Sequence, residues 1–499
     1  MPAYSRWQLW VFSALLIVLG LTLFTRENQF KFYYHPDEPV KGLQVQTAHW
    51  NFHHPMLMLG TARLALKASG EMENRQHVVE VGRWISAGFA AGSVALLAAM
   101  AWITAGRFAG VATGLLLITN HQLFELAHYF KEDTALLFGL SAWFLALTLY
   151  WRRPHWTTAA LVGVGAALAV SGKYLGAFCP LLSLWLVPWH SKQQRFAMLA
   201  VFVSAFAAVF ALVNLPLILS YGSFESSFHR EMALVIHGQS GMTRSVPHTV
   251  YLNAFRDNIA FVLWPFLILR LGACWRRRGE LTAVEGIAAL FPILFLLVLS
   301  FSPKSNDRYF LPATAFFLCA IALGLDQLRA RWPSARVAPA ILAILVLCQI
   351  GGLPKHDLWS YYRAFQTDDR ADLAAWLNIN LPHATLAQDR SVKLPVPAIT
   401  ELLPYQPRLS PTMVQPSVEK IADLAAFRKA SVTHVILSAN DFGRYNLESL
   451  RPQKGAEAVH VKSRDLYRVL RAQKPLWERP RDTVIYLHPG LEVYELPAE

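Results

Sequence analysis

Residues 34–39 read Tyr-His-Pro-Asp-Glu-Pro and place two adjacent carboxylates, Asp37 and Glu38, shortly after the first apolar segment of the chain. An aspartate that is held near apolar surface and flanked by histidine and proline can accept a proton from a hydroxyl nucleophile. The alternative is structural, because acids in a loop are often solvated or cap the following helix. General-base chemistry at Asp37 is therefore a hypothesis that the remaining sequence has to support.

A second polar cluster, residues 128–133, reads His-Tyr-Phe-Lys-Glu-Asp and stands directly before an apolar segment. Asp133 could cap the helix that follows, or it could hold a divalent cation or position a substrate with His128 nearby. The pair His53-His54 adds imidazole, which is an ordinary metal ligand. No strict metal signature such as HExxH accompanies the pair, so an interfacial polar anchor is its simpler interpretation.

Three cations stand in short polar stretches at the ends of apolar segments: Lys173, Lys304 and Arg308. Such side chains often extend along apolar surface toward lipid headgroups. They also suit a phosphate ligand, which a guanidinium group binds through two parallel hydrogen bonds. A phosphate-binding role is the functional interpretation of all three.

The elements that must position these residues are apolar segments. Several are about 18–22 residues long and nearly free of charge, which is the length that crosses a hydrocarbon core as a helix. The chain of 499 residues is 54% hydrophobic, with a mean hydropathy of +0.31. We expect an α-helical polytopic membrane protein with about eleven spans, at residues 7–25, 82–104, 107–121, 134–151, 157–170, 174–189, 196–220, 255–272, 281–301, 309–326 and 336–352.

The basic residues set the expected orientation, because loops rich in lysine and arginine remain in the cytoplasm. With a cytoplasmic N-terminus, most of the inner loops carry arginine, as at Arg152-Arg153 and at Arg276 to Arg278. An odd number of spans then places the C-terminus outside. Much of the net charge of +13 comes from basic residues that are spread over separate loops and set the topology. We therefore expect no nucleic-acid partner.

The chain divides at Gly351-Gly352, where the composition changes. Residues 1–352 form the expected membrane domain, with large outer loops at 26–81 and 221–254. Residues 353–499 contain no spanning segment and predict a small extracytoplasmic α/β domain. Its expected elements are an amphipathic helix and three short strands, at 368–380, 432–437, 484–486 and 493–494.

This topology brings many polar residues to the outer ends of the helices, on one side of the membrane. They are Asp37, Glu38, His53, His54, Glu125, His128, Glu132, Asp133, Lys173, His237, Arg244, Lys304, Asp307 and Arg308. A transporter or flippase would instead place ionisable groups near the bilayer midplane. A polytopic lipid or sugar transporter is therefore the alternative that we favour less, and an assembly scaffold leaves the outer polar residues unexplained.

In this order, the segments resemble the C-type glycosyltransferase superfamily (GT-C fold), and most of all the bacterial family 39 relatives of protein mannosyltransferases and aminoarabinose transferases. Residues 35–39 resemble the acidic motif of the family's first outer loop, and residues 127–133 resemble the motif that precedes its fourth span. Residues 172–174 and 308–312 are further matches. The likeness covers most of residues 1–330, but the His53-His54 pair departs from the aminoarabinose transferases.

The resemblance implies a multi-pass enzyme of the bacterial inner membrane that transfers a hexosyl or pentosyl group from a polyprenyl-phosphate donor. The acceptor would be a hydroxyl group of a lipid, glycan or protein on the periplasmic face, and a single displacement would invert the anomeric carbon. The implied catalytic residues are Asp37 as the base, Glu38 and Asp133. Substrate binding would fall to His128, Lys173, Arg244, Lys304 and Arg308, and a divalent metal cation, where one is used, to Glu38, His54, Asp133 or His237.

Overall fold

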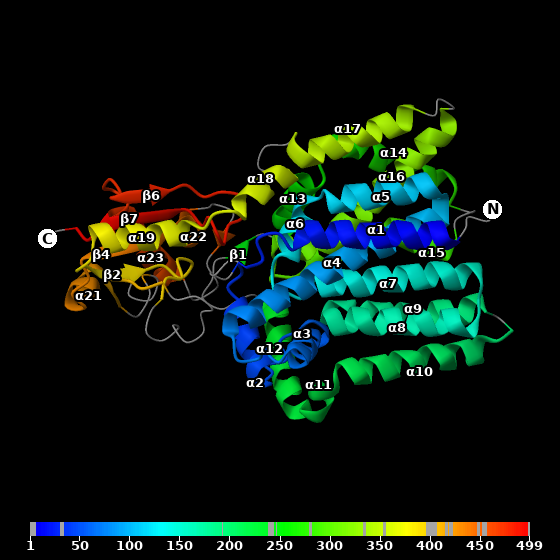
Figure 1. Ribbon diagram of the computed structural model, residues 1–499, viewed down its shortest axis with the longest axis horizontal. Coiled ribbons are helices and arrows are strands. Elements are labelled where there is room, and N and C mark those ends of the chain that lie inside the picture. The colour runs from blue at the N-terminus through cyan, green and yellow to red at the C-terminus, as the bar shows by residue number, and fades with distance from the viewer. Residues whose placement is uncertain are drawn as a thin grey trace.

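The computed structural model describes residues 6–29, 34–191, 193–237, 244–245, 247–278, 282–332, 336–352, 356–395, 407–414, 418, 423–446, 450–451 and 457–497. A bundle of helices forms one end of the molecule, and a small sheet with its helices forms the other (Figure 1). The N-terminus lies at the far end of the bundle and the C-terminus at the far end of the sheet (Figure 1).

Each of the eleven apolar segments overlaps a helix of the bundle. These helices are α1 (Arg6–Phe24), α4 (Arg75–Ala105), α5 (Arg107–Ile118), α7 (Asp133–Arg152), α8 (Trp156–Gly172), α9 (Phe178–His190), α10 (Arg195–Val213), α14 (Trp264–Arg276), α15 (Ala283–Ser300), α16 (Leu311–Arg331) and α17 (Val337–Gly351). The segment expected at 255–272 runs from the end of α13 (Pro247–Asn258) across a 77° bend into α14. Among the described residues, five helices are long and apolar enough to cross a membrane, or six if a pair bent by 77° counts as one span. The helical fold class is confirmed, while the number of spans stays a prediction.

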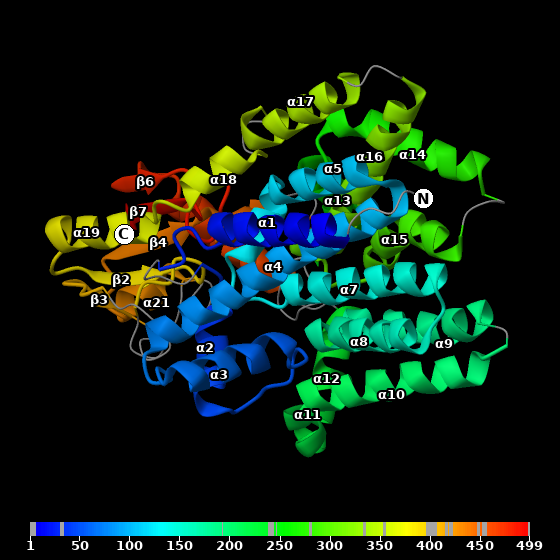
Figure 2. The same cartoon turned by 45° about the vertical axis from the view of Figure 1, so that its right-hand side comes forward.

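Shorter helices gather at one end of the bundle. They are α2 (Glu38–Thr47), α3 (Leu57–Ser69), α6 (His121–Ala127), α11 (Leu215–Leu219), α12 (Tyr221–His237), α13 (Pro247–Asn258) and α18 (Leu358–Ala364), with the 3-10 turns η1 (Tyr174–Ala177), η2 (Phe261–Leu263) and η3 (Asp307–Phe310). Figure 2 shows α2 and α3 beside the start of α4, and both helices pack on it. The outer loops expected at 26–81 and 221–254 therefore supply much of this layer.

Small residues let the bundle helices approach closely. A Cβ atom added at Gly139 of α7 would lie 2.3 Å from the backbone nitrogen of Ala169 in α8. One added at Gly165 of α8 would lie 2.6 Å from the backbone of Trp143 in α7. Since apolar burial against lipid gains nothing within a membrane, contact at this distance is what holds such helices together.

The C-terminal region holds a five-stranded mixed sheet in the order β3-β2-β4-β7-β6, in which β2 is parallel to β3 and β4, and β7 is antiparallel to β4 and β6. Its elements are α19 (Asp369–Asn380), β2 (Thr385–Gln388), β3 (Thr412–Met413), α21 (Leu424–Lys429), β4 (His434–Ser438), α22 (Ala439–Asn446), α23 (Glu457–Leu470), β6 (Trp477–Arg479) and β7 (Leu491–Glu495). A separate two-stranded pairing joins β1 (Arg244–Ser245) to β5 (Leu450–Arg451).

The expected helix at 368–380 is confirmed as α19, whose Leu373 and Leu377 are fully buried. The strands expected near 432–437 and 493–494 are also present, as β4 and β7. The strand expected at 484–486 is wrong, because these residues form a turn between β6 and β7. Val484 and Leu487 of this turn are fully buried in the core of the helix bundle instead of pairing in the sheet.

Candidate active site

Glu38 begins α2 and is fully buried in a set of hydrogen bonds. Its carboxylate accepts bonds from Arg83 (Nη2 at 2.8 Å and Nε at 3.3 Å) and from the backbone nitrogens of Tyr34 and Phe130, at 2.8 and 2.9 Å. Phe130 fits here because its ring packs where a side chain at Gly82 would stand. Glu38 therefore fastens two loops to α4, and its expected role as a catalytic or metal-binding acid stays a prediction.

Asp37 immediately precedes Glu38, but its side chain is 48% exposed. Its Oδ2 atom pairs with Lys131, which is itself buried. Its Oδ1 atom has no hydrogen-bond partner among the described residues. Proline at position 36 and the buried neighbour at position 38 fix the backbone on both sides, so the structure holds one carboxylate oxygen of Asp37 in an accessible position.

Asp133, the first residue of α7, lies between two of the predicted cations. Lys173 donates to its Oδ1 at 2.6 Å, and Arg308 Nε stands 3.8 Å from its Oδ2. The distance of 3.8 Å is too long for a hydrogen bond. Arg308 Nε and Asp133 Oδ2 both lack a hydrogen-bond partner among the described residues. Arg308 also lies 2.6 Å from His35 Nε2, so it connects Asp133 to the loop of Asp37.

Two more ion pairs surround this centre. Lys41 of α2 pairs with Glu132, and His54 Nε2 lies 3.7 Å from the other oxygen of the same carboxylate. Burial, followed by the nearby cations such as Lys41 and Lys173, lowers the pKa of His54 well below its usual range. The imidazole of His54 is therefore neutral at pH 7.

Glu231 of α12 forms the other pair, with Lys304 at 2.5 Å and His53 at 2.9 Å. Burial alone would raise the pKa of Glu231, but the hydrogen bonds from His53 and Lys304 outweigh it and lower that pKa to about 2. The centre thus combines the cations Lys41, Lys131, Lys173, Lys304 and Arg308 with the carboxylates of Asp37, Glu132, Asp133 and Glu231.

An amphipathic cavity of about 230 Å³ opens beside these groups. Its polar end carries His53, His54, Asp133, Lys173 and Lys304, and its apolar wall comes from α12 and α15, with Met232, Val235, Val298 and Leu299. Tyr309 also lines it, with Lys173 Nζ 4.4 Å from the ring centroid. Cations and aliphatic side chains in one cavity match a phosphate group that carries a hydrocarbon chain. We call this cavity the amphipathic groove.

A second cavity, of about 360 Å³, lies on the other side of Arg308. It is lined by α6, α13, residues 306–308 and the turn between β6 and β7, including His35, Glu125 and Tyr486. We call it the polar cavity. Arg308 faces this cavity, while its partner Asp133 lines the groove, so the pair stands between the two spaces.

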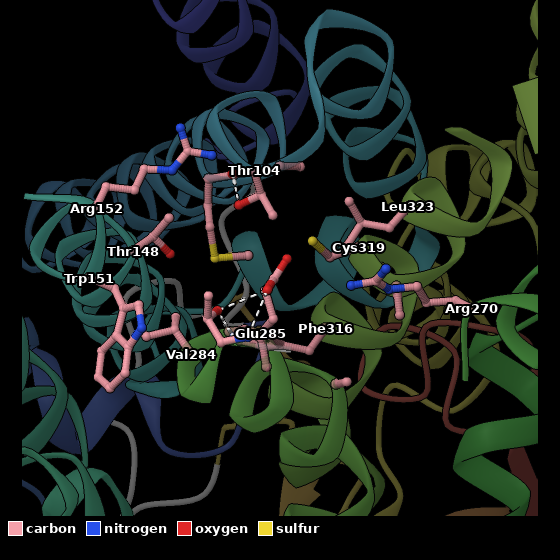
Figure 3. Close-up of a pocket in the computed structure, with 16 residues that line it drawn as sticks. Thr104, Thr148, Trp151, Arg152, Arg270, Val284, Glu285, Phe316, Cys319 and Leu323 are labelled. Atoms are coloured by element: carbon pink, nitrogen blue, oxygen red, sulfur yellow. Dashed lines mark hydrogen bonds between the residues drawn. The ribbon is translucent and has the colours of Figure 1, made fainter. Parts of the chain in front are cut away.

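A third cavity, of about 120 Å³, lies among the opposite ends of the helices (Figure 3). Trp151 in its wall is 18 residues beyond Asp133 along α7, which corresponds to roughly 27 Å. Glu285, Arg270 and Cys319 line it from α15, α14 and α16 (Figure 3). The carboxylate of Glu285 is used in capping α15 with Thr282. This cavity is too far away to take part in chemistry at Asp37.

Other predicted residues lie outside this centre. His128 is fully buried, with its ring nitrogens 2.7 and 2.9 Å from backbone carbonyl oxygens and its ring stacked on Phe365. Its expected substrate-binding role stays a prediction. His237 is exposed at the end of α12. Arg244 belongs to β1, and its side chain is outside the described residues.

A metal site is also not assembled by the described residues. No three histidine, cysteine, aspartate or glutamate side chains among them lie close enough to hold a metal ion. Glu38 is already bonded to Arg83, and Asp133 stands between Lys173 and Arg308. The ligand set of Glu38, His54, Asp133 and His237 is therefore not supported, because the first is neutralised and the third is surrounded by cations.

Several residues of the centre were not proposed from the sequence: His35, Lys41, Lys131, Glu231 and Tyr309. Lys41 follows Glu38 by three positions on α2, and Lys131 adjoins the predicted acid cluster, so short-range spacing could have indicated both. Glu231 lies in α12, and only the fold brings it to His53 and Lys304. Sequence spacing gives no signal for that contact.

The folding pattern and the groove define a class of protein: the chain has the GT-C fold of membrane glycosyltransferases. The structure of ArnT from Cupriavidus metallidurans bound to undecaprenyl phosphate matches with a TM-score of 0.54 and 15% identity, over 98% of each chain. The oligosaccharyltransferase AglB from Archaeoglobus fulgidus, in complex with an inhibitory peptide and a dolichol-phosphate, matches with a TM-score of 0.52 and 9% identity, over 87% of this chain and 71% of the other.

The amino-acid sequence itself matches one family model, described as dolichyl-phosphate-mannose-protein mannosyltransferase, over residues 64–230, about one third of the chain. No curated protein matches the sequence significantly. The resemblance inferred from the motifs is therefore confirmed at the level of the fold.

Proposed function

We propose that this protein is an integral-membrane glycosyltransferase that uses a polyprenyl-phosphate-linked sugar as donor and a hydroxyl group as acceptor. The amphipathic groove carries this proposal, because it combines Lys173 and Lys304 with an aliphatic wall in one cavity. Solved structures of the same fold are of complexes with undecaprenyl phosphate and with a dolichol-phosphate. The family match over residues 64–230 supports the same chemistry.

In the proposed reaction, the acceptor hydroxyl transfers its proton to the accessible oxygen of Asp37 while its oxygen attacks the anomeric carbon of the donor. The bond between that carbon and the phosphate oxygen breaks, and the bonding electron pair leaves with the phosphate. One displacement inverts the anomeric configuration. General-base catalysis of this kind contributes about 10²- to 10⁴-fold to the rate.

The leaving group is a lipid phosphate, whose negative charge grows as the bond breaks. Fixed cations stabilise such charge most effectively where water is excluded. Lys173 is held by Asp133, and Lys304 is held by Glu231, so both ammonium groups are oriented before the donor binds. Arg308 keeps an unpaired Nε–H donor at the same place, among the described residues. No step requires a metal ion.

We place this reaction at the extracytoplasmic face of the bacterial inner membrane, where a lipid-linked donor replaces nucleotide sugars. The ionisable groups of the centre lie at the ends of the helices that face the C-terminal region, including the start of α7 and the end of α8. That position suits an interfacial reaction better than transport through the midplane. The sugar and the acceptor stay open.

The test is transfer from a radiolabelled polyprenyl-phosphate sugar by the purified protein, with release of polyprenyl phosphate as the second readout. Lys304→Met is expected to raise the donor KM about 10- to 100-fold, because it removes one charge-assisted contact. The matched control is Lys462→Met, at an exposed lysine of α23. Movement of intact donor between leaflets, without release of polyprenyl phosphate, would instead support a flippase.

A further inference from the structure

The polar cavity differs from the amphipathic groove in chemistry, although Arg308 separates them by a single side chain. Its wall contains two carboxylates, Asp257 and Asp307, together with amide groups such as Gln122 and Asn253. Among its described lining residues, Arg308 is the only lysine or arginine, and its guanidinium already contacts His35 and Asp133. Asp257 is paired with Arg256 at 2.9 Å, and Asp307 remains beside Arg308, so this wall offers an anionic ligand no excess of positive charge.

Glu125 adds a further uncharged hydrogen-bonding group to this wall. Burial raises its pKa to about 8, although the hydroxyl of Tyr129 donates to the carboxylate at 2.5 Å and partly offsets that effect. At pH 7 the carboxyl group is therefore mainly protonated. It can donate one hydrogen bond and accept others, which suits a hydroxyl group as partner.

Aromatic rings form another part of the wall of the polar cavity, beside aliphatic side chains such as Val250 and Ile485. Tyr486 lies with its ring centroid 4.7 Å from that of His35 and 5.9 Å from that of Tyr129. The ring centroid of Tyr361 lies 4.8 Å from that of His121. Aromatic faces pack well against the C–H faces of a sugar ring, and the carboxylates and amides can bond its hydroxyl groups. A volume of about 360 Å³ is in the range of small-molecule sites.

We propose that the polar cavity binds a sugar ring that carries no phosphate, and that the C-terminal region completes this site through Tyr486. The ring is either part of the acceptor or the glycosyl group of the donor. The assignment of the ring to the acceptor or the donor rests on the proposed function. The proposal that a sugar ring binds here rests only on the residues that line the polar cavity.

The position of Tyr486 is fixed by the residues around it. Val484 and Leu487 are fully buried in the bundle core, on either side of the tyrosine. Asn440 donates to the backbone oxygen of Ile485 at 2.8 Å, and His488 Nε2 lies 2.8 Å from the backbone oxygen of Ala364. The turn between β6 and β7 therefore presents Tyr486 as a preformed wall. This gives residues beyond the membrane helices a direct part in ligand selection.

The experiment uses the full-length protein in detergent and measures binding of free mannose, glucosamine and mannose 6-phosphate by saturation-transfer NMR. Mannose and glucosamine are expected to bind the wild type. Tyr486→Ala is expected to weaken mannose binding about tenfold, because it removes one stacking face. Tyr221→Ala, at an exposed tyrosine of α12, is the matched control and is expected to bind as the wild type does.

A second variant, Asp307→Asn, keeps the shape of the wall if Tyr486→Ala does not fold. It removes one negative charge, so binding of mannose 6-phosphate at this site is expected to strengthen relative to mannose. The proposal is overturned if folded Tyr486→Ala binds mannose as the wild type does, or if Asp307→Asn leaves the ratio of mannose 6-phosphate to mannose binding unchanged. It is also overturned if the wild type binds no monosaccharide, or if mannose 6-phosphate competes with mannose as well as unlabelled mannose does.

Competition with lipids distinguishes the two sources of the ring. If the site holds the donor's sugar, polyprenyl-phosphate mannose suppresses the mannose signal and polyprenyl phosphate does not. If the site holds the acceptor, neither lipid suppresses it. All of these measurements proceed without turnover, so a protein that binds mannose here but transfers no sugar would contradict the proposed function and leave the binding site standing.

Discussion

Asp37 and Glu38 are neighbours in the sequence, and the fold separates their roles completely. Glu38 points into the protein and binds Arg83, whereas Asp37 keeps one carboxylate oxygen accessible. Removing one partner of a buried ion pair leaves the other charge uncompensated, which is far more costly than losing an exposed pair. Substitution of Glu38 should therefore lower the stability of the protein, whereas substitution of Asp37 should lower the rate of transfer.

Glu38→Gln is expected to destabilise the protein by about 3–5 kcal/mol, because Arg83 is fully buried and loses its counter-charge. Thermal unfolding in detergent measures the effect. The matched control is Asp372→Asn, at an exposed pair with Arg479, where the loss should be about 0–1 kcal/mol. Equal melting temperatures for the two variants would show that the buried pair does not hold the loop.

The pH dependence of stability should carry the signature of Glu125. Its pKa is raised by burial to about 8 in the folded protein, whereas the usual value is 4.5. The folded state therefore binds this proton more tightly, so the contribution to stability is complete below pH 4.5 and is lost as the pH rises to about 8. The melting temperature of the wild type should fall, relative to that of Glu125→Gln, between these values. Parallel curves for the two proteins would contradict the assignment.

The sequence was informative about Asp37, Asp133, Lys173, Lys304 and Arg308, which the fold brings to one centre. It could not distinguish the inward acid from the outward one, because both stand in the same loop and the partner Arg83 is 45 positions away from Glu38. The sequence also gave no sign that the ring nitrogens of His128 face backbone carbonyl oxygens, one of them 102 positions away.

At the scale of elements, apolar length located the bundle helices approximately, but it gave neither their ends nor the 77° bend that divides residues 255–272. The segment expected at 82–104 extends to Arg75 as α4, since Asn74 caps it by accepting a bond from the nitrogen of His77. The turn at 484–486 was missed because its apolar residues match a strand pattern, whereas the helix bundle buries them. A pattern of apolar residues indicates that they are buried, but it does not show which element they pack against.

Close helix contact gives a prediction at this scale. Gly139→Ala would place a Cβ atom 2.3 Å from the backbone of α8, so α7 and α8 would have to separate. We expect a clear loss of folded protein in detergent, measured by size-exclusion chromatography and thermal unfolding. Gly88→Ala is the matched control, because no atom lies within 4 Å of its added Cβ. Equal yields and melting temperatures would mean that this contact contributes little.

For the whole molecule, the C-terminal region and the outer ends of the helices share one site through Tyr486 and the pairing of β1 with β5. This arrangement requires both to be on the same side of the membrane. Together with the basic inner loops, it predicts a cytoplasmic N-terminus and an extracytoplasmic C-terminus.

Alkaline phosphatase fused after residue 499 should therefore be active in whole cells, because this enzyme folds only outside the cytoplasm. A fusion within the basic stretch at 276–278 should be inactive and serves as the control. The reverse pattern would invert the topology and move the site to the cytoplasmic face.

The central proposal is that Asp37 is the base of the glycosyl transfer. It is tested most directly by single-turnover transfer from a labelled polyprenyl-phosphate sugar, with the anomeric configuration of the product read by NMR. The wild type, Asp37→Asn and the exposed control Asp465→Asn are compared, with the melting temperature and donor binding of each protein measured in parallel. We predict an inverted product, a rate at least about 100-fold lower for Asp37→Asn with donor binding retained, and an unchanged rate for the control. Transfer by Asp37→Asn at the wild-type rate, or a product with retained configuration, would contradict the account.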